Sequence, residues 1–321
     1  TFMHPALSVI LFTTLSGAGY GLLAWAALAA LGGGTSARAL LVSTLLALVL
    51  ASVGLLASFW HLGKPLRAWR AFSQWRTSWL SREGVAAVLT YVPALLFAAI
   101  LLPAMLDPAA QASVASFNAS GVAVAIALTL SALATVACTA MIYASLKPIP
   151  AWGHPLVLPG YLGFALLCGG LLLAAIEATN TGLAPPAIVA KAGIVLAALL
   201  GALKLRYWRG IDAKPLASTR GDAVGLPGRK VDVFERPHTE SNYLTTEMAF
   251  VVARKHAHRL RGLSLLLFAV VPILCLFAIG RIDSVAAVTW LWLAAVSALA
   301  GAFVERWLFF AQARHLVTLY Y

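Results

Sequence analysis

Eight long apolar segments constrain the fold of this 321-residue chain more than any other feature. A helix needs about 20 mostly apolar residues to cross the hydrocarbon core of a membrane. Backbone amides in lipid must be satisfied within their own segment, which argues against strands. The sequence therefore predicts an all-α integral membrane protein, an eight-transmembrane-helix bundle forming a single polytopic membrane domain (1–321). The predicted spans are Leu7–Leu31, Ala39–Trp60, Val85–Ala104, Gly121–Ala144, Gly160–Ala178, Ala187–Leu205, Leu263–Ile279 and Val285–Phe310.

Composition and charge agree with a membrane protein and orient it. Hydrophobic residues make up 61% of the chain and charged residues only 11%, which excludes a soluble domain with one core. No basic residue precedes the first span, which is also longer than a signal-peptide core, so we expect a retained helix. Eight spans place both termini on one side, together with the loops after the second, fourth and sixth spans.

The side with the termini carries nineteen Lys and Arg residues, against Arg38, Lys191 and Arg281 for the other side. Without the long loop after the sixth span the ratio is still eight to three. Because cytoplasmic loops are rich in Lys and Arg, we expect both termini in the cytoplasm and a location in a bacterial inner membrane. The net charge of +12 then reflects topology and contact with anionic lipids, so no nucleic-acid partner is expected.

Cysteine and histidine positions give no support for a metal centre in this chain. Cys138, Cys168 and Cys275 lie singly in separate predicted spans, without a Cys-x-x-Cys pair, and are expected to be small buried hydrophobic residues. None of the seven histidines lies well inside a span, where a membrane haem would take its axial ligands. We therefore predict no iron–sulfur cluster, no zinc site and no haem.

The link between the second and third spans, residues 61–83, concentrates polar and aromatic side chains between two apolar segments. Pro65 suits the first turn of a new helix, where its missing amide costs nothing. From there Trp69, Phe72, Trp75 and Trp79 recur every three or four residues, with arginines between them. This pattern predicts an interfacial helix lying in the membrane plane. Aromatic belts and snorkelling arginines also occur without catalysis, so the arginines alone decide nothing.

His61 and Glu83 are the candidate catalytic residues of the link. His61 ends the second span and Glu83 opens the third, so both are expected at one edge of the bundle. Imidazole and a semi-buried carboxylate can both exchange protons near neutral pH, which suits a proton-coupled redox ligand. The structural alternatives are a headgroup-level histidine and a first-turn glutamate favoured by the helix dipole, with Ser81 as N-cap. For His61 and Glu83 taken together, we favour the proton-exchanging role over these structural alternatives.

Three motifs resemble the DmsC family, the membrane anchor subunits of bacterial enzymes of the dimethyl-sulfoxide-reductase type. The most specific motif is His61-Leu62-Gly63-x-Pro65-x-Arg67-Ala68 followed by Ser81-x-Glu83. The others are His4-Pro5 leading into Thr13-Thr14-Leu15-Ser16-Gly17-Ala18-Gly19, and Lys147-Pro148-Ile149-Pro150-Ala151-Trp152. The resemblance covers most of the chain and is weakest in the long loop, residues 206–261.

The resemblance implies a quinone site and two partner subunits. In such complexes a molybdopterin catalytic subunit and an iron–sulfur subunit dock on the anchor, which exchanges electrons and protons with ubiquinone or menaquinone. By similarity, His61 would hydrogen-bond a quinone oxygen and Glu83 would relay protons. Lys64 or Arg67 would stabilise a developing quinolate, and Trp79 would contribute to the site.

The long loop, residues 206–261, is expected to dock the partner subunits on the cytoplasmic side. Its middle part, Gly221–Asn242, is too polar for lipid. The following Tyr243–Leu260 is predicted to form an amphipathic helix with a solvated basic face, suited to an acidic partner surface or lipid headgroups. His256 and His258 face differently on a helix, which argues against a metal pair.

The direction of electron flow rests on resemblance within the family. The chain looks like the anchor of the cytoplasmic sulfite-oxidising enzyme (SoeC type), and this resemblance implies quinone reduction with electrons from sulfite. The alternatives are quinol oxidation for S-oxide reduction, a purely structural anchor, and a transporter or proton pathway. A transporter would need ionisable residues inside the bundle, and the chain offers Glu177, Lys191 and Glu305. An ion pair between Glu177 and Lys191 across the Thr179–Pro186 loop would explain these two residues without transport. Glu305 could line the quinone pocket instead.

Overall fold

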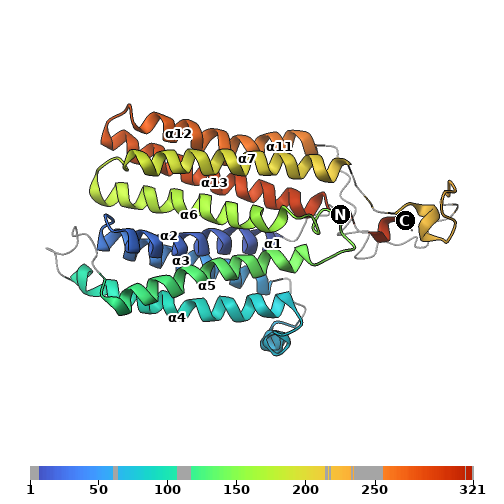
Figure 1. Cartoon of the computed structure of the whole chain (residues 1–321), viewed down its shortest axis with the longest axis horizontal. Helices are drawn as coiled ribbons and strands as arrows, with labels where there is room; N and C mark the ends of the chain where they lie inside the picture. Colours follow the sequence, from blue (N-terminus) through green and yellow to red (C-terminus); the bar gives the residue numbers. More distant parts are fainter. Residues whose placement is uncertain are drawn as a thin grey trace.

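A computed structural model describes residues 7–60, 64–106, 117–213, 216, 218–232, 234, 256–314 and 316–319. In this part of the chain there is no β-strand, and eight helical spans are long and apolar enough to cross a membrane. The spans run side by side along the length of the molecule (Figure 1). The predicted eight-helix fold is confirmed.

Two of the eight spans contain a π-helical turn. The first span consists of α1 (Leu7–Leu11), the π-turn η1 (Phe12–Ser16) and α2 (Gly17–Gly32). The seventh consists of α11 (Ala257–Leu265), the π-turn η3 (Leu266–Val270) and α12 (Val271–Ile279). The uninterrupted spans are α3 (Ala37–Phe59), α4 (Trp79–Leu106), α5 (Ala119–Ala144), α6 (Val157–Thr181), α7 (Ala187–Ala213) and α13 (Ser284–Ala311).

Three helix ends at the side of the link lie well beyond the predicted boundaries. Helix α4 begins at Trp79 rather than Val85, α7 continues to Ala213, and α11 begins at Ala257. A hydropathy window stops at the first charged residues, whereas the backbone hydrogen bonds of a helix continue through them. Both ends of the predicted loop 206–261 are therefore helical. Its middle contains the short helix α8 (Arg220–Ala223), and most of the predicted helix Tyr243–Leu260 lies outside the described residues.

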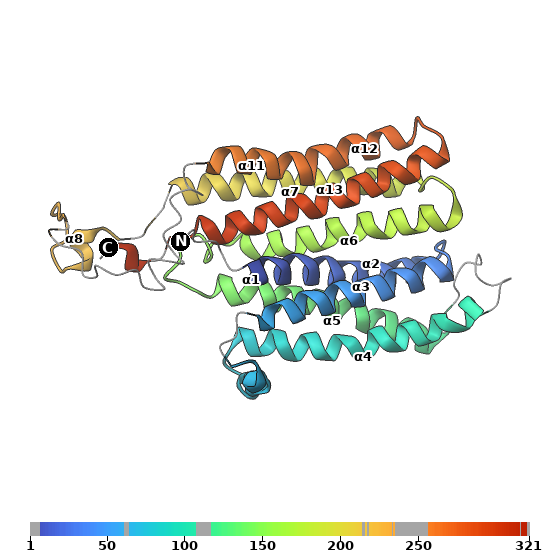
Figure 2. The same cartoon turned by 180° about the vertical axis from the view of Figure 1, so that it is seen from behind.

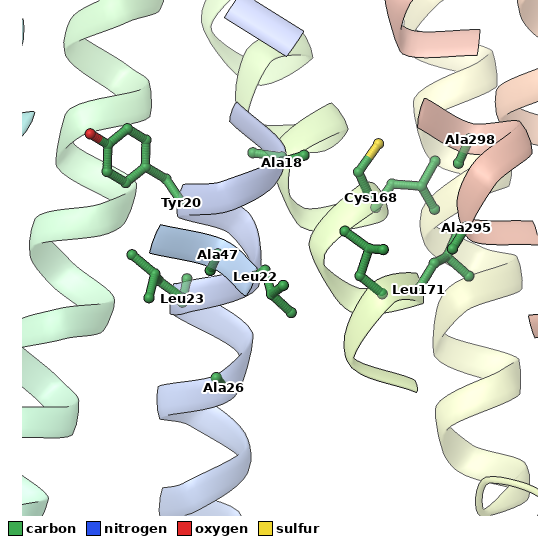
Figure 3. Packing of buried hydrophobic residues seen from close by; sticks show 14 of the residues in the cluster. Ala18, Tyr20, Leu22, Leu23, Ala26, Ala47, Cys168, Leu171, Ala295 and Ala298 are labelled. Atoms are coloured by element: carbon green, nitrogen blue, oxygen red, sulfur yellow. The ribbon is translucent and has the colours of Figure 1, made fainter. Parts of the chain in front are cut away.

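The bundle has two halves, the first four spans and the last four, which meet where α2 packs on α6. Figure 3 shows Ala18 and Leu22 of α2 on the side of Cys168 and Leu171 of α6. The helices can approach this closely because glycines lie at the crossing. A Cβ atom added to Gly169 would lie 2.3 Å from the carbonyl carbon of Gly21. Small residues at such crossings are the usual means of packing helices in membranes.

Candidate functional site

The link between α3 and α4 forms a 3₁₀ helix, η2 (Pro65–Gln74), with Pro65 in its first turn. Because a 3₁₀ helix has three residues per turn, side chains three apart form one ridge. Figure 2 shows η2 nearly end-on beside α4, so its axis runs across the direction of the spans. One ridge is apolar and the next mostly basic, and each includes one residue beyond the end of η2. All eight residues are exposed: Leu66, Trp69, Phe72 and Trp75, then Arg67, Arg70, Ser73 and Arg76.

The first turns of α4 fasten η2 to the bundle. The Ser81 hydroxyl donates a hydrogen bond to the carbonyl of Ala71. Arg82 donates to the carbonyls of Trp75 (3.0 Å) and Arg76 (2.7 Å). Ser81 is therefore not the N-cap expected in the structural alternative, since α4 already begins two residues earlier at Trp79. These contacts fix the position of the link relative to Glu83.

Glu83 faces the interior of the bundle. The residue is only 5% exposed, and its Oε1 atom has no hydrogen-bond partner among the described residues. Tyr20 of α2 and Tyr143 of α5 lie within electrostatic range of this carboxylate. The Tyr20 hydroxyl is also buried and unpartnered in the described part of the chain. A buried polar atom without a partner is rare and identifies a candidate site for a ligand or a proton.

Of the other predicted site residues, the structure places only Trp79 in the same helix as Glu83. His61 lies outside the described residues. Lys64 and Arg67 are exposed on the link, and neither forms an ion pair with Glu83. Trp79 is half-buried at the start of α4, where the Arg82 guanidinium lies 4.3 Å from its ring centroid. The structure thus brings Trp79, Glu83 and the aromatic link together at one edge of the bundle.

A second polar cluster joins α7 to α13 around Glu305, which is recognisable in the sequence but without its ionic partners. Lys204 forms an ion pair with Glu305 Oε1, and Arg306 donates to Glu305 Oε2 at 2.9 Å. The three side chains are at most 6% exposed. Lys204 was missed because it lies inside an apolar window. The signal was present nevertheless, since a lysine in one span and a carboxylate in another are costly in lipid unless they pair.

Glu177 has a different partner from the one expected. Its carboxylate accepts hydrogen bonds from the backbone amide (3.2 Å) and the hydroxyl (3.1 Å) of Ser36, the N-cap of α3. Lys191 is exposed, and no ion pair joins it to Glu177, so the predicted pairing is wrong. The carboxylate instead ties the end of α6 to the start of α3.

Cysteines and possible metal ligands are dispersed. Cys168 and Cys275 are buried and Cys138 is half-buried, as expected of small hydrophobic residues. In the part of the chain that the structure describes, no three His, Cys, Asp or Glu side chains come close enough to hold a metal ion.

His154, in the loop between α5 and α6, gives a testable pH dependence. Its Nδ1 accepts a hydrogen bond from the amide of Leu156 (3.1 Å), which only the unprotonated nitrogen can do. Partial burial, with the charges of Lys204 and Arg206, lowers the pKa of His154 below its usual value. His154 therefore binds a proton more readily in the unfolded chain than in the folded one. The free energy of unfolding should fall as the pH drops below about 6.5. Thermal unfolding between pH 8 and 5 should show this loss in the native protein and a smaller one in His154→Gln.

Comparison with known proteins places the chain in a family. A model of the family "DMSO reductase anchor subunit (DmsC)" matches residues 3–312. The chain is also 35% identical to a sulfite dehydrogenase subunit of Allochromatium vinosum over 327 aligned positions, which cover 99% of each chain. Together with the eight spans, these matches show that the chain is a multi-pass membrane protein and belongs to the DMSO reductase anchor subunit family.

Proposed function

We propose that this protein is the quinone-reactive membrane anchor of a molybdopterin and iron–sulfur oxidoreductase, and that its quinone site lies at the link. The buried Oε1 of Glu83, without a partner in the described residues, is the observation that carries the proposal. Trp69 of η2 and Trp79, the first residue of α4, belong to the elements at the same end of the bundle as Glu83. A quinone headgroup needs this combination of an apolar aromatic surface and a few proton-exchanging groups.

The proposed reaction adds two electrons and two protons to a quinone to give a quinol. The electrons would come directly from the nearest iron–sulfur cluster of a partner subunit, because no redox centre is expected in this chain. Glu83 would relay protons to a quinone oxygen, and His61 would hydrogen-bond the other oxygen. Lys64 and Arg67 have weaker support, since both are exposed on the link.

Sulfite is the proposed source of the electrons, because the relative from Allochromatium vinosum is a sulfite dehydrogenase subunit. The second candidate is the reverse direction, quinol oxidation for reduction of dimethyl sulfoxide or another S-oxide, which the family name supports. In either case the basic side of the bundle, with the link and the termini, would face the cytoplasm and dock the partners. The amphipathic ridges of η2 support its place at the membrane surface.

Quinone turnover of the purified complex tests the proposed site. We expect His61→Ala and Glu83→Gln to lower the rate of quinone-coupled electron transfer by about 100-fold or more, since each removes a proton-exchanging group. Activity of the catalytic subunit with an artificial dye should be unchanged, provided that the subunits remain assembled. Glu177→Gln, which alters a carboxylate at the other end of the bundle, is the matched control and should keep native turnover. Native turnover in both link variants would reject the assignment.

A further inference from the structure

The cluster of Lys204, Glu305 and Arg306 is not electrically balanced. It contains two cations and one carboxylate, all of them buried between α6, α7 and α13. The neighbouring Arg261 does not change this excess, because Asp212 holds its guanidinium through two hydrogen bonds of 2.6 and 3.0 Å. One positive charge therefore lies within a membrane span without a counter-charge among the described residues. Such a charge is costly unless something neutralises it.

Hydrogen-bond donors exceed acceptors in the same place. An ammonium group has three N–H donors and a guanidinium five. In the described part of the chain, the polar partner of both Lys204 and Arg306 is Glu305 alone. Aromatic rings lie close to both groups. The Lys204 Nζ lies 3.9 Å from the ring centroid of Tyr207, and the Arg306 Cζ lies 3.6 Å from that of Tyr161.

Two small hollows meet at Arg306. Each encloses a cavity of only about 10 Å³, and the two share Tyr161, Phe164 and Arg306. Lys204 lines the first hollow, and Thr14, in the π-turn of the first span, lines the second. The buried hydroxyls of Thr14 and Tyr161 have no partner among the described residues. The space left between the side chains in each hollow suits a ligand about the size of one water molecule.

We propose that these hollows hold a single monovalent anion of halide size, bound by the Lys204 ammonium and the Arg306 guanidinium. A water molecule would accept the spare hydrogen bonds but would leave the extra charge. A sulfite or sulfate ion is too large for the space and would add a second negative charge. The first hollow is lined by Leu156, Val157 and Gly160 at the start of α6, so the anion would enter from the end of the bundle where the link lies. Bound there, it stabilises the contact between α6, α7 and α13.

Thermal unfolding of the purified full chain tests this site independently of quinone chemistry. Sodium chloride replaces sodium gluconate at constant ionic strength, and sodium bromide is tested in the same way. We expect a saturable rise in Tm of about 2–4 °C with both halides, because a ligand that binds only the folded state stabilises it. An equal Tm in chloride and gluconate at every concentration would overturn the proposal without bearing on the quinone site.

Two variants with opposite expected effects locate the anion. Lys204→Met leaves a neutral pair of Arg306 and Glu305, so the halide-dependent rise in Tm should disappear. Glu305→Gln leaves two unbalanced cations, so the rise should be larger and half-complete at lower halide concentration. Arg281→Gln, which removes an exposed cation from the α12–α13 loop, is the control and should respond like the native protein. Native halide dependence in Lys204→Met or in Glu305→Gln would contradict binding at this cluster.

Discussion

Gly169→Leu is expected to prevent the two halves of the bundle from packing together. Even the Cβ atom of the new side chain would lie 2.3 Å from the carbonyl carbon of Gly21 and 2.4 Å from the amide nitrogen of Leu22. Both contacts are with backbone, which no rotamer change can move away. Helices α2 and α6 would have to separate, and the core residues between them, such as Leu22 and Leu171, would lose their packing. We expect a loss of about 3 kcal/mol or more in the free energy of unfolding.

Thermal unfolding and size-exclusion chromatography in detergent measure this effect. Gly262→Leu is the matched control, because Gly262 is an exposed helical glycine with open space around its Cβ position. That variant should keep the native Tm or raise it slightly, since it removes a glycine from a helix. A monodisperse Gly169→Leu protein with native Tm would show that α2 and α6 do not cross at these glycines.

Glu305→Gln is expected to destabilise the second half of the bundle strongly. Glu305 is 1% exposed and accepts from both Lys204 and Arg306, so the amide leaves two buried cations without their shared counter-charge. Removing one partner of a buried ion pair typically costs about 3–5 kcal/mol, much more than the pair itself contributes. Reversible unfolding in denaturant, or Tm at a fixed halide concentration, measures the loss.

The exposed ion pair between Arg220 and Asp232 supplies the control for this prediction. Its atoms are 3.5 Å apart, and the Asp232 side chain is 88% exposed. Asp232→Asn should therefore change stability by less than about 1 kcal/mol, as is usual for surface pairs. Equal stability of Glu305→Gln and the native protein would mean that the two cations are neutralised in another way.

The spans could be predicted from the sequence because length and hydropathy are local properties of a segment. The ends of the spans at the side of the link could not be predicted in this way. Arg82 and Arg206 end the apolar windows, but helices α4 and α7 continue past them. The apolar and basic spacing of the link was visible too, whereas its 3₁₀ geometry was not. Spacings of three suit both helix types, and the hydrogen bonds from Ser81 and Arg82 that hold η2 come from the next span.

The two polar clusters differ in how far the sequence could reveal them. Glu83 was recognisable because it stands beside a motif that resembles a family pattern. Arg306, one partner of Glu305, is its neighbour in α13, but the other partner, Lys204, belongs to α7, and neither helix alone specifies that the two helices lie next to each other. For the same reason Glu177 was assigned the nearest cation in the sequence, Lys191, although its partner Ser36 belongs to a distant segment.

Labelling the purified complex with a photoreactive quinone tests the central claim most directly. After illumination, the labelled residues of this chain are located by mass spectrometry, with excess unmodified quinone as competitor. A quinone site at the link predicts competitor-sensitive labels between Trp60 and Glu83, and loss of most of this labelling in Glu83→Gln. Competitor-sensitive labels confined to other parts of the chain, such as the hollows around Arg306, would contradict it.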